Sequence, residues 1–169
     1  MTEFNIAFIL AGIIILILGY LWTQHYNKRI KGPNCKMSFR ESLDLAELPV
    51  VTFYQGKTKI NFILDTGSNL SIIDKLVASR LEIEPNDLNV SIIGIEGNSK
   101  DVTTGIMKVA YKDIQFEDVF QIIDMSKSFK SIKDRTGVTV HGILGNGFFQ
   151  KYQYVLDFES MIAYTKKRK

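Results

Sequence analysis

The chain has 169 residues, 46% of them hydrophobic, and its 21 Lys and Arg against 18 Asp and Glu give a formal charge of +3. Such a mild charge does not predict a nucleic-acid partner, which usually requires a strongly basic face. With 12 Gly, 3 Pro, 1 Cys and 2 His, the composition excludes collagen-like chains, disulfide frameworks and the common Cys/His zinc sites. We therefore expect one ordinary domain with no metal and no cofactor.

The first strong feature is an apolar run from Ile6 to Trp22, which holds 17 consecutive residues without a charged or strongly polar group. As a helix it would span about 26 Å, just short of a hydrocarbon core of about 30 Å. We interpret residues 1–26 as an uncleaved transmembrane anchor. A signal peptide is the alternative, but Glu3 precedes the run without any Lys or Arg, and no small-x-small cleavage site follows it.

Several basic residues follow the run, namely Lys28, Arg29, Lys31 and Lys36. Because cytoplasmic flanks of membrane helices are enriched in Lys and Arg, this bias predicts a single-pass protein with its remaining domain on the cytoplasmic side. Residues 27–47 are polar and basic, contain Gly32-Pro33 and lack a sustained apolar period, so we expect a linker there.

From residue 48 the pattern changes to short β-branched and aromatic runs separated by turn residues, which predicts strands. The expected strands are, in chain order, a hairpin of Val50–Tyr54 with Lys59–Leu64, a hairpin of Asn89–Ile95 with Lys100–Tyr111, Ile114–Ile123, Val138–Leu144, and a hairpin of Tyr154–Phe158 with Met161–Thr165. Helices are expected over Ile73–Leu81 and within Asn146–Tyr152, whereas Met125–Thr136 is polar and predicts a loop. Residues 48–165 thus form a mostly-β domain, and 166–169 form a basic tail.

The chemistry centres on Asp65, which follows an apolar strand in the sequence Asp-Thr-Gly-Ser over residues 65–68. A carboxylate at the end of a buried strand is costly unless its charge is satisfied or shared. Gly67 lets the backbone turn closely under the carboxylate, and Thr66 and Ser68 supply hydroxyls within its reach. A purely structural alternative is an Asp that caps the turn or the following helix.

Three segments in this order resemble the retropepsin-like aspartic proteases, the single-domain family of retroviral and related bacterial enzymes. They are Leu64–Ser68, the glycine-bearing hairpin Ile92–Asn98, and Gly142–Gly145 followed by Phe148-Phe149 and Tyr154–Phe158. The resemblance covers about residues 48–165. It implies a single-domain retropepsin-like acid protease β-barrel, preceded here by one transmembrane helix as in a membrane-anchored bacterial type.

The resemblance also implies a role for each matching residue. Asp65 would be the catalytic aspartate, Thr66 would lock the paired loops across a dimer axis, and Gly67 would permit the turn. We expect Ser68 to donate a hydrogen bond to Asp65 and so to lower the lower apparent pKa of the catalytic pair. The flap and floor that bind substrate would be Ile93, Gly94, Ile95, Glu96, Gly97, Ile143, Leu144 and Gly145. Asn146-Gly147 departs from the charged or larger residue that often follows this motif, so no dimer-stabilising salt bridge is expected there.

Peptide hydrolysis of this kind needs one carboxylate to activate water and one carboxylic acid to protonate the peptide group. The chain contains one Asp-Thr-Gly, because Arg135 interrupts the similar sequence from Asp134 to Gly137. We therefore expect a homodimer whose two-fold axis pairs two Asp65 carboxylates, acting as a membrane-anchored aspartic endopeptidase on peptides or proteins.

Two alternatives to this function stay open. One is a catalytically silent module of the same fold, tethered to the membrane, that binds peptides or assembles other proteins. The other is a phosphate-binding enzyme of the actin and sugar-kinase class, whose first loop also combines Asp, Gly and Ser/Thr after a strand. That second fold needs a much longer chain than residues 37–169 provide.

Overall fold

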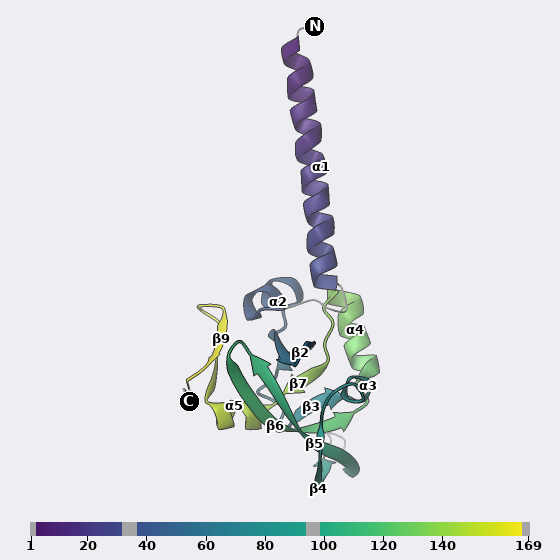
Figure 1. Ribbon diagram of the computed structural model, residues 1–169, viewed down its shortest axis with the longest axis vertical. Helices are drawn as coiled ribbons and strands as arrows, with labels where there is room; N and C mark the ends of the chain where they lie inside the picture. The colour runs from purple at the N-terminus through teal and green to yellow at the C-terminus, as the bar shows by residue number, and fades with distance from the viewer. Residues whose placement is uncertain (1–2, 32–36, 94–98, 167–169) are drawn as a thin grey trace.

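The computed structural model describes the chain over residues 3–31, 37–93 and 99–166. Its first helix, α1 (Glu3–Lys31), extends away from the remaining elements, which gather near its C-terminal end (Figure 1). Large apolar side chains along α1 are exposed, with Ile15 at 69% and Leu16 at 74%. In the described part of the chain, no helix is both long and apolar enough to cross a membrane, so the predicted transmembrane helix is not supported.

Seven of the described strands form one mixed sheet in the order β1-β2-β7-β3-β6-β5-β4, and β1 also pairs with β5. These strands are β1 (Val50–Gln55), β2 (Thr58–Leu64), β3 (Ser71–Asp74), β4 (Glu84–Ile93), β5 (Ser99–Tyr111), β6 (Ile114–Ile123) and β7 (Gly142–Leu144). The extra pairing joins Tyr54 to Ala110 and curls the sheet into a barrel. A separate hairpin is made by β8 (Tyr154–Asp157) and β9 (Ile162–Thr165).

The three predicted hairpins are present with antiparallel pairing: β1 with β2, β4 with β5, and β8 with β9. The predicted strand over 138–144 is shorter than expected, because its regular part is limited to Gly142–Leu144. The mostly-β barrel predicted from the sequence is therefore confirmed.

Part of the predicted linker is folded. Helix α2 (Phe39–Ala46) begins with a reciprocal capping box, in which Ser38 caps the Glu41 N–H and the Glu41 carboxylate caps the Ser38 N–H. Phe39 is 4% exposed, and its ring packs edge-on against Phe158. The expectation of a linker up to residue 47 is therefore wrong for this segment. The helix is hard to predict from the sequence, because its apolar stripe, Phe39 and Leu43, covers only one turn.

The other helices differ from expectation in length and place. Ile73 is fully buried within β3, so the helix predicted over 73–81 begins later, as α3 (Lys75–Ala78), with Asp74 as its N-cap. The loop predicted over 125–136 is wrong, because α4 (Ser126–Thr136) forms there and buries Phe129. The short helix predicted within 146–152 is confirmed as α5 (Asn146–Tyr152).

The main core lies between the barrel and α5 and is rich in aromatic rings. Its fully buried aromatic members, each at most 1% exposed, are Phe53, Phe62, Phe116, Phe120 and Phe148. Phe148 meets Phe53 edge-on at 6.0 Å and lies 5.4 Å from the Phe116 ring. Burying each such ring contributes about 1.5–3 kcal/mol, so α5 is held firmly against the sheet. This packing also places the turn before α5 beneath the Asp65 loop.

Candidate active site

Asp65 stands where two parallel strands end together. β2 pairs with β7 in parallel, with Leu64 opposite Leu144. One residue further on, the Asp65 N–H donates to the Leu144 carbonyl at 3.0 Å. The backbone at Asp65 is therefore fixed by the sheet, although the residue itself lies just beyond the strand.

The Asp65 carboxylate is held by its own loop. The Gly67 N–H donates to Asp65 Oδ1 at 2.9 Å, and the Ser68 N–H donates to the Asp65 carbonyl at 3.3 Å. A Cβ at Gly67 would lie 3.2 Å from Asp65 Oδ1, which is tight. Asp65 is half-buried while Thr66 and Gly67 are exposed, so the head of this loop faces outward. The arrangement leaves the carboxylate accessible and oriented.

The expected hydrogen bond from Ser68 to Asp65 is absent. The Ser68 hydroxyl instead donates to the Leu70 carbonyl at 2.7 Å. A serine hydroxyl has one proton to donate, and a short Ser-turn to the carbonyl two residues on satisfies it locally. Ser68 therefore shapes the descending side of the loop and does not donate to the carboxylate.

The turn from Gly145 to Gly147 supports the Asp65 loop from below. The Asn146 N–H donates to the Ser68 carbonyl at 2.6 Å, and the Gly147 N–H donates to the Asn69 carbonyl at 3.3 Å. Gly145 approaches so closely that a Cβ there would lie 2.5 Å from the Leu70 carbonyl oxygen. Only glycine fits at this contact.

This geometry gives the segment after residue 142 a supporting role. Leu144 is fully buried in the main core, Gly145 is buried under the loop, and half-buried Ile143 packs on the second cluster around Val50 and Val138. Leu144 and Gly145 thus support the Asp65 loop. Both residues lie beneath the backbone that they brace, and the substrate-binding floor expected of them stays a prediction.

The predicted flap is the hairpin of β4 and β5, whose pairing extends to Ile93 opposite Ser99. Its tip, with Gly94, Ile95, Glu96 and Gly97, lies outside the described residues. The pairing shifts register between Asn86 and Val90, which marks a β-bulge or a similar irregularity partway along the hairpin.

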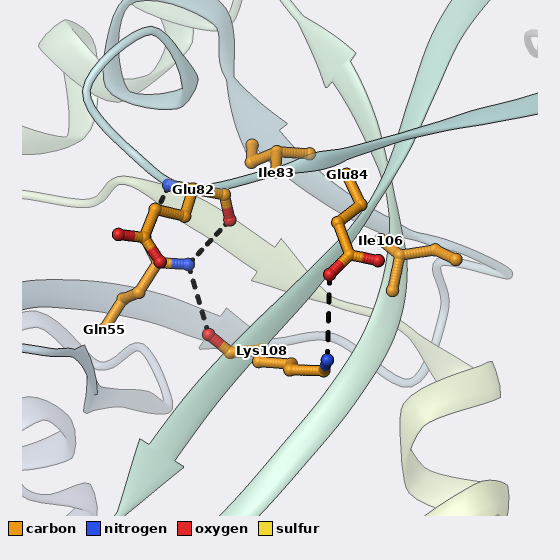
Figure 2. A pocket seen from close by; sticks show the side chains of 6 residues that line it. All are labelled: Gln55, Glu82, Ile83, Glu84, Ile106 and Lys108. Carbon is orange, nitrogen blue, oxygen red and sulfur yellow. Dashed lines mark hydrogen bonds and ion pairs between the residues drawn. The ribbon is translucent and has the colours of Figure 1, made fainter.

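A recess of about 370 Å³ opens beside the base of this hairpin, lined by Gln55, Glu82, Ile83, Glu84, Ile106 and Lys108 (Figure 2). The Gln55 side chain lines one side of it (Figure 2). Its amide nitrogen donates to the Glu82 carbonyl at 2.8 Å and to the Lys108 carbonyl at 3.2 Å, and its oxygen accepts from the Glu82 N–H at 2.7 Å. Gln55 thus ties the end of β1 to β5 and to the segment just before β4.

Gln55 and two residues behind the loop, Ser71 and Asp118, were not predicted from the sequence. No motif marks any of them, because their importance arises from partners 27 or more positions away in the chain. Among the described residues, no group of three His, Cys, Asp or Glu side chains is placed to hold a metal ion.

A mostly-β barrel that presents an Asp-Thr-Gly turn at a strand end, braced by a buried Leu-Gly segment, defines an aspartic protease. The family model described as aspartyl protease matches residues 50–148, and the chain belongs to this family. No curated protein matches the chain.

Two solved structures are similar to this chain. The first is the retroviral protease-like domain of Ddi1 from Leishmania major, at 13% identity and a TM-score of 0.48, covering 72% of this chain and 90% of that one. The second is the EIAV protease complexed with the inhibitor HBY-793, at 17% identity and a TM-score of 0.44, covering 64% of this chain and 90% of that one.

Proposed function

We propose that the chain is an aspartic endopeptidase whose active site forms at the axis of a homodimer. Each protomer would contribute its Asp65, so that Asp65 and Asp65 of the partner subunit face one another across the axis. The observation that carries this proposal is the Asp65 loop itself, which fixes the backbone against β7 while its carboxylate, half-buried, lies beside an exposed Thr66.

The paired carboxylates would share one proton. Two like charges held close together repel, so one carboxyl group of the pair keeps a proton while the other is ionised. The ionised member removes a proton from water, whose oxygen attacks the peptide carbonyl carbon. The protonated member donates its hydrogen bond to the carbonyl oxygen and so stabilises the tetrahedral intermediate. The carboxyl group that took the proton from water then gives it to the leaving nitrogen, and the C–N bond breaks.

The hairpin of β4 and β5 supports this reading, because it extends from the barrel as a two-stranded arm of the kind that can close over a bound peptide. Extended peptides commonly bind by adding a strand to such an exposed edge. We propose peptides or proteins as substrates, with apolar side chains near the cleaved bond.

The test is cleavage of a peptide library by the full chain, from acidic to neutral pH, with molecular mass recorded at each protein concentration. Asp65→Asn preserves shape and removes the ionisable group, and Asp113→Asn is the matched control at an exposed turn. We expect cleavage that rises with the dimer fraction, disappears in Asp65→Asn and persists in Asp113→Asn. A folded dimer that cleaves nothing at any pH would contradict the proposal and favour the silent peptide-binding or assembly module.

We further propose that α1 attaches this protease domain to a membrane, with the domain on the cytoplasmic side. The support is the uncharged run from Ile6 to Trp22, whose described side chains are exposed, and the basic residues that follow it. Flotation of the full chain with lipid vesicles, against a version begun at Met37, tests attachment. Labelling of Cys35, the single cysteine, by an impermeant maleimide tests sidedness. Labelling in intact cells would contradict the cytoplasmic orientation.

A further inference from the structure

We propose that Ser71 and Asp118 are positioning residues for catalysis, which hold the turn at Gly145 against the Asp65 loop. The inference rests on the proposed protease function and assigns a role to residues that do not touch the reacting atoms. Ser71 begins β3, directly after the loop, and Asp118 lies on β6, which pairs with β3 in parallel. The two side chains meet only because these strands are neighbours.

The contact between them is short and directional. The Ser71 hydroxyl donates to Asp118 Oδ2 at 2.6 Å, within the range of charge-assisted O–H···O bonds. Ser71 is 1% exposed, so water does not compete for this hydroxyl. With its proton committed to Asp118, the Ser71 oxygen keeps its lone pairs free to accept, and the Gly145 N–H donates to it at 3.1 Å.

Gly145, held by Ser71, in turn restrains the Asp65 loop through direct backbone contact. A Cβ built on it would lie within 3 Å of the Leu70 and Ser68 carbonyl oxygens, so its backbone is in direct contact with the descending side of the loop. The next N–H, at Asn146, donates to the Ser68 carbonyl. The ascending side is held by Leu144, which accepts from the Asp65 N–H. Both sides of the loop therefore depend on one segment, and Ser71 secures that segment.

Stability alone does not explain an aspartate at position 118, because burying its carboxylate costs free energy of folding. Its burial raises the pKa of its carboxyl above the ordinary value, although the Ser71 hydroxyl, the Val119 N–H and the charge of Lys151 oppose the shift. A raised folded-state pKa means that the folded chain disfavours the charge, so this group favours folding at low pH and disfavours it as pH rises through its folded pKa. Asn in its place would remove that cost, but it would accept the Ser71 hydrogen bond without the charge that strengthens it.

The experiment compares Ser71→Ala, Asp118→Asn and the control Glu117→Gln, an exposed carboxylate next to Asp118 on the same strand that pairs with Lys108. For a positioning pair, we expect kcat to fall about 10-fold or more in Ser71→Ala and Asp118→Asn, with KM changed far less, because a misplaced catalytic group costs rate more than binding. Glu117→Gln should leave both constants unchanged.

The melting temperature separates positioning from mere stability. At neutral pH, Asp118→Asn should melt no lower than the wild type, and the acid limb of its kcat profile should change because one titrating group is gone. Wild-type kcat with a wild-type pH profile in Asp118→Asn would overturn the inference. A fall in kcat that only follows a fall in melting temperature would overturn it as well.

A second readout keeps this inference separable from the protease proposal. The backbone amide resonances of Gly67 and Gly145 report the loop and its support without any substrate. If the wild type cleaves nothing, yet both resonances move in Asp118→Asn and stay in place in Glu117→Gln, the positioning pair stands and the protease proposal fails. If the Gly67 resonance stays in place in both variants, the pair does not position the loop.

Discussion

His141 and Asn61 are joined by two hydrogen bonds of opposite sense. The His141 N–H donates to the Asn61 carbonyl at 2.9 Å, and the Asn61 N–H donates to the Nδ1 atom of the His141 ring at 2.8 Å. Nδ1 can accept this hydrogen bond only when it carries no proton, and both ring nitrogens carry a proton in the charged form. The second bond therefore requires a neutral imidazole. The pair connects the segment before β7 to β2, the strand that leads into Asp65.

This contact predicts a loss of stability in mild acid. Burial lowers the pKa of His141 below its ordinary value of 6.5, with Asp74 opposing the shift and Lys133 adding to it. The His141 ring is therefore protonated near pH 6.5 in the unfolded chain, but only at lower pH in the folded chain. The stabilisation is fully present above the unfolded pKa and is lost as pH falls towards the folded one.

The measurement is the urea midpoint as a function of pH for the wild type and His141→Asn, whose side-chain oxygen can replace Nδ1 as the acceptor. We expect the histidine contribution to the pH dependence to disappear in His141→Asn and to persist in His25→Asn, since the chain has 2 histidines in all. Equal slopes for wild type and His141→Asn would contradict this account.

A methyl group at Gly145 should be far more damaging than one at Gly147. At Gly145 the added Cβ would meet backbone atoms of Leu70 at 2.5 and 2.6 Å, which cannot move without displacing the Asp65 loop. At Gly147 the nearest atom is the Asn69 carbonyl oxygen at 3.5 Å, an ordinary contact. We expect Gly145→Ala to cost about 1–3 kcal/mol of unfolding free energy and to abolish cleavage.

Gly147→Ala is the matched control, since it adds the same methyl group two residues later in the first turn of α5. We expect it to be neutral or slightly stabilising, because Ala favours helix over Gly by up to about 1 kcal/mol. Thermal melts of the two variants provide the comparison. Equal destabilisation by both would show that the close approach at Gly145 is not the limiting contact.

Gln55→Ala should loosen the hairpin of β4 and β5 at its base. The substitution removes the three hydrogen bonds that tie β1 to Glu82 and Lys108 (Figure 2). Because these bonds are solvent-exposed, each contributes at most about 1 kcal/mol. We expect faster amide hydrogen exchange along β4 and β5, a higher KM, and little change in the melting temperature. Gln115→Ala, at an exposed position near the start of β6, should leave exchange in β4 unchanged.

Ser68→Ala should leave the acid limb of the pH–rate profile where it is. The Ser68 hydroxyl donates to the Leu70 carbonyl and not to Asp65, so its removal does not alter the hydrogen bonds of the carboxylate. We expect a loss of about 1 kcal/mol of stability from the unpaired carbonyl. An upward shift of the acid limb in Ser68→Ala would mean that the hydroxyl turns to Asp65 in the working enzyme.

The parts of the fold that follow from local patterns were predictable. The hairpins of β1 with β2 and of β8 with β9 have alternating or apolar strands and short turns, and Asn146–Tyr152 carries enough apolar residues to indicate α5. Helix α4 was not, because its sequence is mostly Lys, Ser and Asp, and its buried side rests on Phe129 and half-buried Ile132. Tertiary packing, rather than local preference, makes that segment helical.

The same division holds within the site. Asp65, Thr66 and Gly67 form a contiguous motif whose chemistry is visible in the sequence. The braces behind them are not contiguous: Ser71 and Asp118 are 47 positions apart and meet through parallel pairing of β3 and β6. The order of strands in a mixed sheet cannot be derived from strand patterns alone, so neither the contact nor its partner at Gly145 could have been inferred.

The helix found where a linker was expected has a practical consequence for producing the protein. The Met37 N–H donates to the Thr52 hydroxyl at 2.6 Å, the Thr52 N–H donates back to the Met37 carbonyl at 3.0 Å, and Met37 is 1% exposed. A recombinant version begun at Leu48, the apparent start of the β pattern, would strip Met37 and Phe39 from the barrel and leave apolar surface open to aggregation. A version begun at Met37 keeps these two side chains packed on the barrel. Helix α2 is therefore part of the protease domain.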